Sequence, residues 1–190
     1  MQPEQDQQKY TPEGFRIPSV ERIALILPLT IGGKIGEQLL AELKKSERVN
    51  IDERARIIVE SSRFTVLPEP QQRGIGIMAV SDLVPNPKGS SASIEEIELA
   101  RDKLGFEPVS DDTAIQLLLQ RGSEFFFHGM TFFMSMKIQD DRGRPFLFRV
   151  GVDEEHDFSK LLLSVYPAMP PIPCFPNYRF PVLIPQKNKT

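Results

Sequence analysis

Residues 130–152 read MTFFMSMKIQDDRGRPFLFRVGV, and this stretch determines the predicted fold. Every even-numbered position from 130 to 138 is apolar, whereas three of the four odd-numbered positions are polar. The same alternation returns at residues 146–152, after the turn-forming sequence DDRGR at residues 140–144. A period of two residues indicates strands with one face in solvent, and two such runs around a glycine-containing turn predict an antiparallel hairpin. Residues 160–166 are expected to add a third antiparallel strand.

The segment before this hairpin contains two predicted pairs of helices. In the first pair, residues 37–45 carry leucines at helical spacing, and Asn50 or Asp52 is positioned to cap a second helix that ends near Ser62. Apolar runs at residues 22–29, 64–67 and 75–84 predict strands around this pair. A proline at position 28 limits the first run to an edge strand or a strand end.

The second pair begins at Ser93, which forms a capping box with Glu96. This helix is expected to end at Gly105, since glycine is favoured just after a helix C-terminus. Ser110 then opens another helix, whose first turn carries two aspartates at the positive end of the helix dipole and which Gly122 is expected to end.

The C-terminal segment, residues 167–185, contains seven of the 17 prolines of the chain together with several large apolar residues. Because proline removes a backbone donor and fixes φ, the segment is predicted to be neither a helix nor a central strand. An extended strap over the domain's own apolar surface explains this composition, and so does a polyproline-type ligand for a partner. The strap is the favoured interpretation, because ligand tails usually carry fewer large apolar groups.

These elements predict an α+β fold in which paired helices pack on an antiparallel sheet and the proline-rich strap closes the far side. The alternative is two smaller lobes joined by an exposed loop. The expected boundaries are tails at 1–14 and 186–190, a single domain at 15–185, sub-lobes at 15–84 and 93–166, a loop at 85–92 and the strap at 167–185.

Composition restricts the class of protein. Hydrophobic residues make up 40% and charged residues 26% of the 190 residues, which excludes wholesale disorder. The net charge of −3 argues against a basic nucleic-acid-binding domain. The longest apolar stretch, residues 23–31, is far shorter than the roughly 20 residues of a membrane span, and the first ten residues lack the apolar core of a secretory signal. The single cysteine, Cys174, allows no intrachain disulfide and favours a cytoplasmic location.

A glycine-rich loop, Gly32-Gly33-Lys34, lies between a predicted strand and a predicted helix, where backbone amides can bind phosphate. It matches neither the dinucleotide fingerprint, since Ile31 occupies the first glycine position, nor the P-loop, since Ile35 follows the lysine. A tight turn that lets helix and strand pack closely is the favoured interpretation.

Titratable residues suggest an alternative, catalytic function. Asp153, Glu155, His156 and Asp157 form an acidic cluster that a divalent metal such as Mg²⁺ or Mn²⁺ could occupy. His128 follows three phenylalanines and is a candidate base. For each the simpler interpretation is favoured, a solvated acidic turn and a histidine at the edge of the core, and no cofactor is predicted.

The favoured function is therefore a non-catalytic module that binds a partner protein or a second copy of itself. Phe133 supports this hypothesis, because it breaks the polar alternation and implies that its face is covered by a helix, the strap or a partner. In the proline-rich segment Phe175, Tyr178 and Phe180 are the candidate binding residues. The alternative is a metal-assisted enzyme that uses the acidic cluster with His156 or His128.

Overall fold

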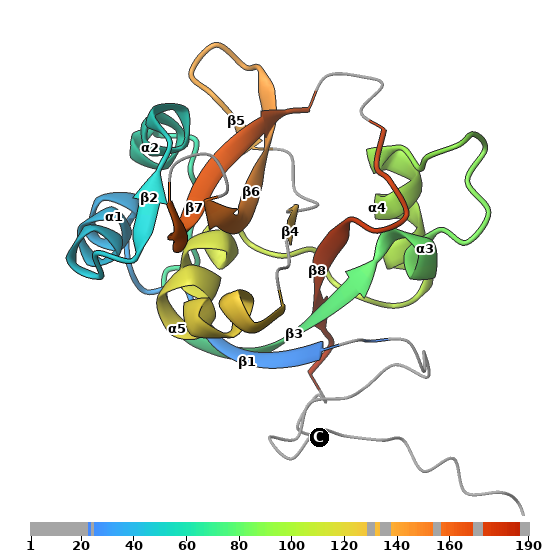
Figure 1. Cartoon of the computed structure of the whole chain (residues 1–190), viewed down its shortest axis with the longest axis horizontal. Helices are drawn as coiled ribbons and strands as arrows, with labels where there is room; N and C mark the ends of the chain where they lie inside the picture. Colours follow the sequence, from blue (N-terminus) through green and yellow to red (C-terminus); the bar gives the residue numbers. More distant parts are fainter. Residues whose placement is uncertain are drawn as a thin grey trace, which may run out of the picture.

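The computed structural model describes residues 23, 25–128, 132–133, 138–153, 157–168 and 173–186. Within these residues it contains five helices and eight strands (Figure 1). In chain order they are β1 (Leu25–Ile31), α1 (Gly36–Lys45), β2 (Val49–Ile51), α2 (Glu53–Glu60), β3 (Gln71–Ala79), α3 (Val80–Leu83), α4 (Ile94–Lys103), α5 (Thr113–His128), β4 (Phe132–Phe133), β5 (Ile138–Gln139), β6 (Pro145–Asp153), β7 (Asp157–Pro167) and β8 (Arg179–Ile184). The predicted mixture of helices and sheet is confirmed.

All eight strands belong to one curled sheet with the order β1-β3-β8-β4-β6-β7-β2, and β5 pairs with β6 beside this path. Most neighbours are antiparallel, but β4 with β8 and β2 with β7 are parallel, so the sheet is mixed. Strands from both halves of the chain contribute, because β1, β2 and β3 precede the loop at 85–92. The sheet curls around α5, which contacts β1, β6 and β7 (Figure 1).

The predicted hairpin is confirmed in its described parts. Both β4 and β5 pair antiparallel with β6, and β7 adds the expected third antiparallel strand. At the turn, the Gly143 N–H donates to the Asp140 carbonyl at 2.9 Å, and Gly143 has φ +75°. The Asp140 carboxylate also accepts the N–H groups of Arg142 and Arg144, so this aspartate organises the turn.

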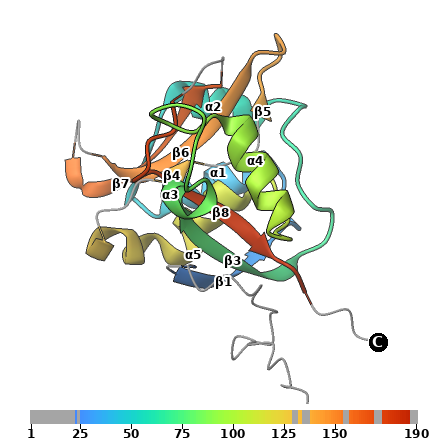
Figure 2. The same ribbon diagram turned by 90° about the vertical axis from the view of Figure 1, so that its right-hand side faces the viewer.

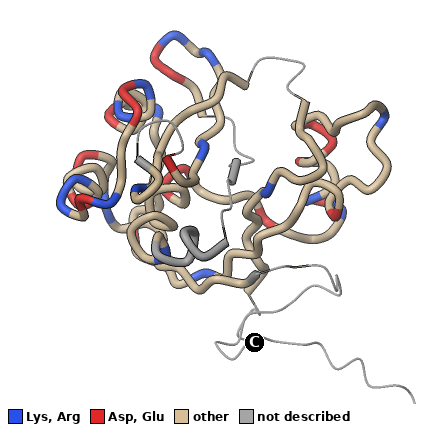
Figure 3. Tube along the Cα trace, viewed as in Figure 1, with Lys and Arg blue, Asp and Glu red and all other residues tan. Residues whose placement is uncertain are grey.

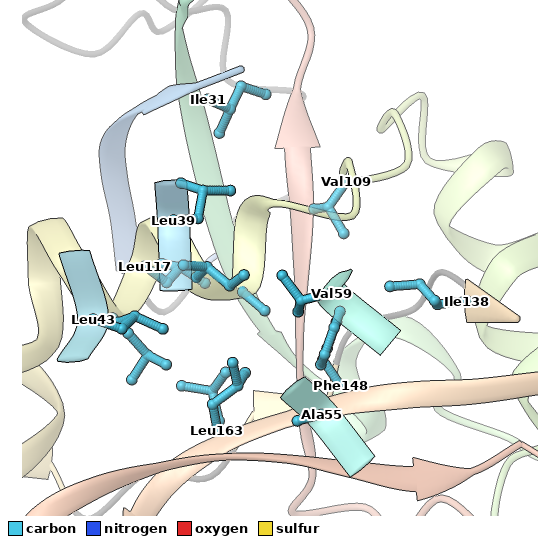
Figure 4. Close-up of a cluster of buried hydrophobic side chains, with 14 of the residues drawn as sticks. Ile31, Leu39, Leu43, Ala55, Val59, Val109, Leu117, Ile138, Phe148 and Leu163 are labelled. Atoms are coloured by element: carbon cyan, nitrogen blue, oxygen red, sulfur yellow. The ribbon is translucent and has the colours of Figure 1, made fainter. Parts of the chain in front are cut away.

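The strand β6 is buried on both faces, and the expectation of one face in solvent is wrong there. Phe146, Phe148 and Val150 lie in a first hydrophobic core, which includes side chains of α1, α2 and α5 (Figure 4). Leu147 is 1% exposed and points into a second core on the other face of the sheet. Side chains of α3 and α4 contribute to this second core, and Figure 2 shows these two helices in front of β8.

The helix caps predicted for α2 and α4 are confirmed, whereas the predicted start of a helix at Ser110 is wrong, because α5 begins at Thr113 and both aspartates precede its first turn. The Asp52 carboxylate accepts the N–H groups of Arg54 and Ala55, and Ser93 and Glu96 bond reciprocally at the start of α4. The predicted pairing of helices is only partly found. α1 packs against α2, as predicted. α4 instead packs against α3 in the second core, whereas side chains of α5 belong to the first core. The two helices of the expected second pair therefore lie on opposite faces of the sheet.

The prediction that Gly122 ends α5 is wrong, because the helix continues to His128. A Cβ atom at Gly122 would lie 2.8 Å from Leu161 Cδ1, so the glycine lets α5 approach β7 closely. The residues from Asp111 to Leu118 are all buried, not only one stripe of them, because the curled sheet and α1 surround this part of the helix.

The prediction that the proline-rich segment contains no central strand is also wrong, because β8 lies between β3 and β4. Leu183 directs its N–H and C=O away from β3, since both bond to Glu107 at 3.0 Å. Pro181 is two residues earlier and has the same orientation, so its missing N–H removes no bond to β3. On the other side of β8 the pairing described with β4 is at Arg179. A continuous strap is not confirmed, since Pro167 ends β7.

Candidate functional site

Three of the four predicted binding residues gather around one small pocket on the second core. We call it the aromatic pocket; its volume is about 40 Å³, and its lining residues are Leu147, Tyr166, Pro173, Cys174, Phe175, Tyr178 and Phe180. The β6–β7 register places Leu147 opposite Tyr166. An antiparallel bridge between Ala92 and Cys174 holds the segment around Cys174 in place. Residues from β6, β7 and this segment, which are far apart in the sequence, therefore meet in the pocket.

Burial divides the aromatic pocket into a floor and a rim. Leu147, Cys174 and Phe180 are almost completely buried and form the floor. Tyr166 and Phe175 are each 46% exposed and form the rim. Sequence reasoning missed Tyr166, because as part of an alternating strand it is not distinguished from other outward-facing positions.

The ring of Phe175 is held in place by its neighbour. Phe175 and Tyr178 meet edge to face, with ring centroids 5.4 Å apart, and the Tyr178 N–H donates to the Phe175 carbonyl at 3.0 Å. The fourth predicted binding residue, Phe133, pairs with Arg149 of β6, and its side chain lies outside the described part of the chain.

Cys174 is a packing residue, because it is 1% exposed and lies in the second core. Burial and, to a smaller extent, the negative charge of Glu95 raise the pKa of the Cys174 thiol to about 11. The thiol is therefore protonated at neutral pH and is a poor nucleophile.

The predicted phosphate loop is bonded to the protein itself. The Gly32 N–H donates to Asp112 Oδ2 at 2.6 Å, and the Gly33 N–H donates to the Leu67 carbonyl at 2.9 Å. Lys34 Nζ lies 2.7 Å from Glu42 Oε2. Both glycines have positive φ, +81° and +77°, which explains the residue type at these positions. In this arrangement neither glycine amide is available to a phosphate oxygen.

Two aspartates at the start of α5 attach the helix to this loop and to the segment after α2. Asp112 is fully buried and bonds Gly32. Asp111 Oδ2 accepts both the N–H and the hydroxyl of Thr65, at 2.8 and 2.6 Å. Burial raises the pKa of Asp111 above its ordinary value, the charge of Asp112 adds to this, and the bonds from Thr65 oppose it. Sequence reasoning recognised these residues only as helix-dipole charges.

A polar groove of about 460 Å³ lies beside the loop, between α1 and α5. Its lining residues are Thr30, Gly32, Gly33, Lys34, Glu42, Pro70, Gln116, Leu119 and Gln120. The Gln120 side chain forms two hydrogen bonds with the backbone of Thr30 on the outer edge of β1, and Arg121 donates to the Pro28 carbonyl on the same edge. The prediction of an edge strand is thus confirmed, and α5 covers this edge.

The acidic cluster is described only in part. Asp153 is fully buried and accepts a hydrogen bond from Asn50 Nδ2 at 2.6 Å, so it is not part of a solvated turn. Glu155 and His156 lie outside the described residues, as do the side chains of Asp157 and His128. Within the part of the chain that the structure describes, no group of three or more histidine, cysteine or acidic side chains could hold a metal ion.

Basic residues of the helices α1 and α2 are interspersed with acidic ones (Figure 3). Arg56 illustrates this, because its guanidinium bonds to both Glu53 and Glu60 on its own helix. The cation is therefore engaged on α2 itself.

No family model, curated protein or solved structure matches this chain. Among the described residues, none of the helices has the length and apolar character needed to cross a lipid bilayer.

Proposed function

We propose that this protein is a non-catalytic interaction module that binds another protein, or a second copy of itself, through the aromatic pocket. The observation that carries the proposal is the rim: two large aromatic side chains, Tyr166 and Phe175, are each 46% exposed beside an indentation with a buried floor. Tyrosine and other aromatic residues are enriched at the centres of protein interfaces, where one rigid ring supplies a large contact area.

The contribution of the two rim side chains to binding follows from their exposed area. A buried aromatic side chain covers about 200 Å², so the 46% that remains exposed on each rim residue corresponds to roughly 90 Å². At about 25 cal/mol per Å², covering one such ring contributes up to about 2 kcal/mol, and the pair contributes up to about 4 kcal/mol. Loss of both rings would then weaken binding by up to about 1000-fold.

The edge-to-face contact between Phe175 and Tyr178 also supports the proposal, because it limits the conformational freedom of the exposed Phe175 ring in the unbound protein. A ring that is already ordered loses less entropy on binding. A cytoplasmic location is part of the proposal, supported by the single buried cysteine.

The proposal is tested by placing a photo-crosslinking amino acid at position 175 in the full chain and irradiating it in a native lysate. Ile57 on α2 is the matched control site, because it is 47% exposed and lies away from the pocket. A defined crosslinked species from position 175, absent from position 57 and lost in Tyr166→Ser, supports the proposal. No product from position 175, together with a monomer in light scattering, or equal products from both sites, would overturn it.

A further inference from the structure

We propose that the polar groove between α1 and α5 is a binding site for a small organic monocarboxylate, whose oxygens accept hydrogen bonds from Gln116 Nε2 and Lys34 Nζ. The site is separate from the aromatic pocket and does not depend on the function proposed above. Its lining comes from β1, the loop at 32–34, α1 and α5. A volume of a few hundred Å³ is typical of sites for small molecules.

The orientation of the Gln116 amide follows from a chain of hydrogen bonds. Thr30 offers a backbone N–H and a backbone carbonyl, and these two groups fix which end of the Gln120 amide carries oxygen and which carries nitrogen. Gln120 Nε2 then donates to Gln116 at 2.7 Å, so the receiving atom must be Gln116 Oε1. The Nε2 of Gln116 is the remaining end of this amide.

The Gln116 Nε2 group has the properties of a ligand donor. Gln116 is only 4% exposed, yet it lines the groove. Among the described residues, Gln116 Nε2 has no hydrogen-bond partner. It is not among the polar atoms that are completely buried without a partner, so it is accessible from the groove. A buried amide with one end fixed and the other directed into a groove is a preorganised donor.

The charges of the groove select the class of ligand. Lys34 and Glu42 are the charged residues among its lining, and their side chains are 43% and 39% exposed. An exposed ion pair of this kind contributes little, so a ligand carboxylate can take the place of Glu42 on Lys34 at small cost. The charges of Lys34 and Glu42 cancel in the unliganded groove; when Glu42 turns to solvent, Lys34 balances one negative charge of the ligand. The glycine amides that a phosphate would need are already bonded. Pro70 and Leu119 offer apolar contact to the rest of the ligand.

The test uses benzoate and its neutral isostere benzamide, added to the isotopically labelled full-length protein and followed by NMR. Benzoate should shift the side-chain amide signal of Gln116 in a saturable way, with a dissociation constant in the millimolar range typical of fragments. Benzamide, which lacks the charge that Lys34 binds, should need a several-fold higher concentration for the same shift. Lys34→Gln, a substitution at an exposed side chain, should weaken benzoate binding about two- to fivefold, because the ion pair with Lys34 is exposed to water. Lys45→Gln, at the far end of α1, is the control and should bind as the wild type does.

The inference would be overturned by no saturable shift with benzoate, by equal shifts with benzamide, or by unchanged benzoate affinity in Lys34→Gln. A shift that saturates without involving the Gln116 amide would do the same, because it would place the ligand elsewhere. None of these outcomes bears on crosslinking at the aromatic pocket, so the two proposals fail independently.

Discussion

Replacing Asp112 with alanine should destabilise the protein by about 3 kcal/mol. Asp112 is fully buried, and its two oxygens accept the Gly32 N–H and the Ser110 hydroxyl, both at 2.6 Å. Alanine leaves the buried Gly32 N–H without an acceptor, which costs about 1–3 kcal/mol. Loss of the Ser110 bond and of a negative charge at the start of α5 adds about 1 kcal/mol.

Two further variants separate the causes of this loss. Asp112→Asn keeps an oxygen for the Gly32 N–H and loses only the charge, so it should cost about 1 kcal/mol. Asp52→Ala removes an exposed aspartate that caps α2 through two backbone amides, and a loss of about 1 kcal/mol is expected from the cap alone.

Urea unfolding followed by circular dichroism measures all three variants, with the slope of the transition as a check that the unfolded states are comparable. Asp112→Ala should have a clearly lower free energy of unfolding than Asp52→Ala. The free energy of unfolding of Asp112→Asn should be close to that of Asp52→Ala. If Asp112→Ala costs no more than Asp52→Ala, the attachment of Gly32 to α5 contributes nothing to stability and the reasoning is refuted.

Three other predictions concern single positions. Gly122→Ala should destabilise the protein by about 1 kcal/mol, because overpacking against Leu161 outweighs a helix-propensity gain of about 1 kcal/mol. In a Leu161→Ala background the same substitution should stabilise the protein, and a double-mutant cycle measures this difference. Burial raises the pKa of Asp111, so the folded protein holds this proton more tightly than the unfolded chain, and the stability from this group falls as the pH rises through that pKa. The melting temperature of Asp111→Asn relative to wild type should therefore increase from about pH 4 to about pH 7, and a constant difference would contradict this. The pKa of Cys174, raised to about 11, together with its burial, should slow its alkylation by iodoacetamide at pH 8 at least about 100-fold relative to the urea-unfolded chain, a ratio that mass spectrometry measures.

Local signals in the sequence predicted the parts of the fold that depend on neighbouring residues. The alternation around residues 140–144 predicts the hairpin, since side-chain period and turn chemistry are both local properties. Pro28 predicts an edge strand, and β1 lies at the edge of the sheet. Ser93 with Glu96 predicts the start of α4, because a capping box involves only one turn of helix.

The errors arise where a residue's role depends on a distant partner. Gly122 resembles a helix stop in sequence, but its role is set by Leu161 on β7. Pro181 is compatible with a central strand only because its nitrogen faces away from β3, which depends on the register of β8. Gln116 stands in an apolar helix with no local sign of function, and the orientation of its amide is fixed only with Gln120 and Thr30 in place.

The strand β6 relates the two candidate sites to each other. Leu147 forms part of the floor of the aromatic pocket, whereas its neighbours Phe146 and Phe148 lie in the first core together with side chains of α5. The polar groove is lined by α5 through Gln116, so both sites are built on elements that meet at this core. A ligand in the groove that changed crosslinking at Phe175 would therefore indicate coupling through β6, because that strand presents side chains to both cores. Independent behaviour would mean that the packed core isolates the two sites, which is expected if neither ligand moves the backbone of β6.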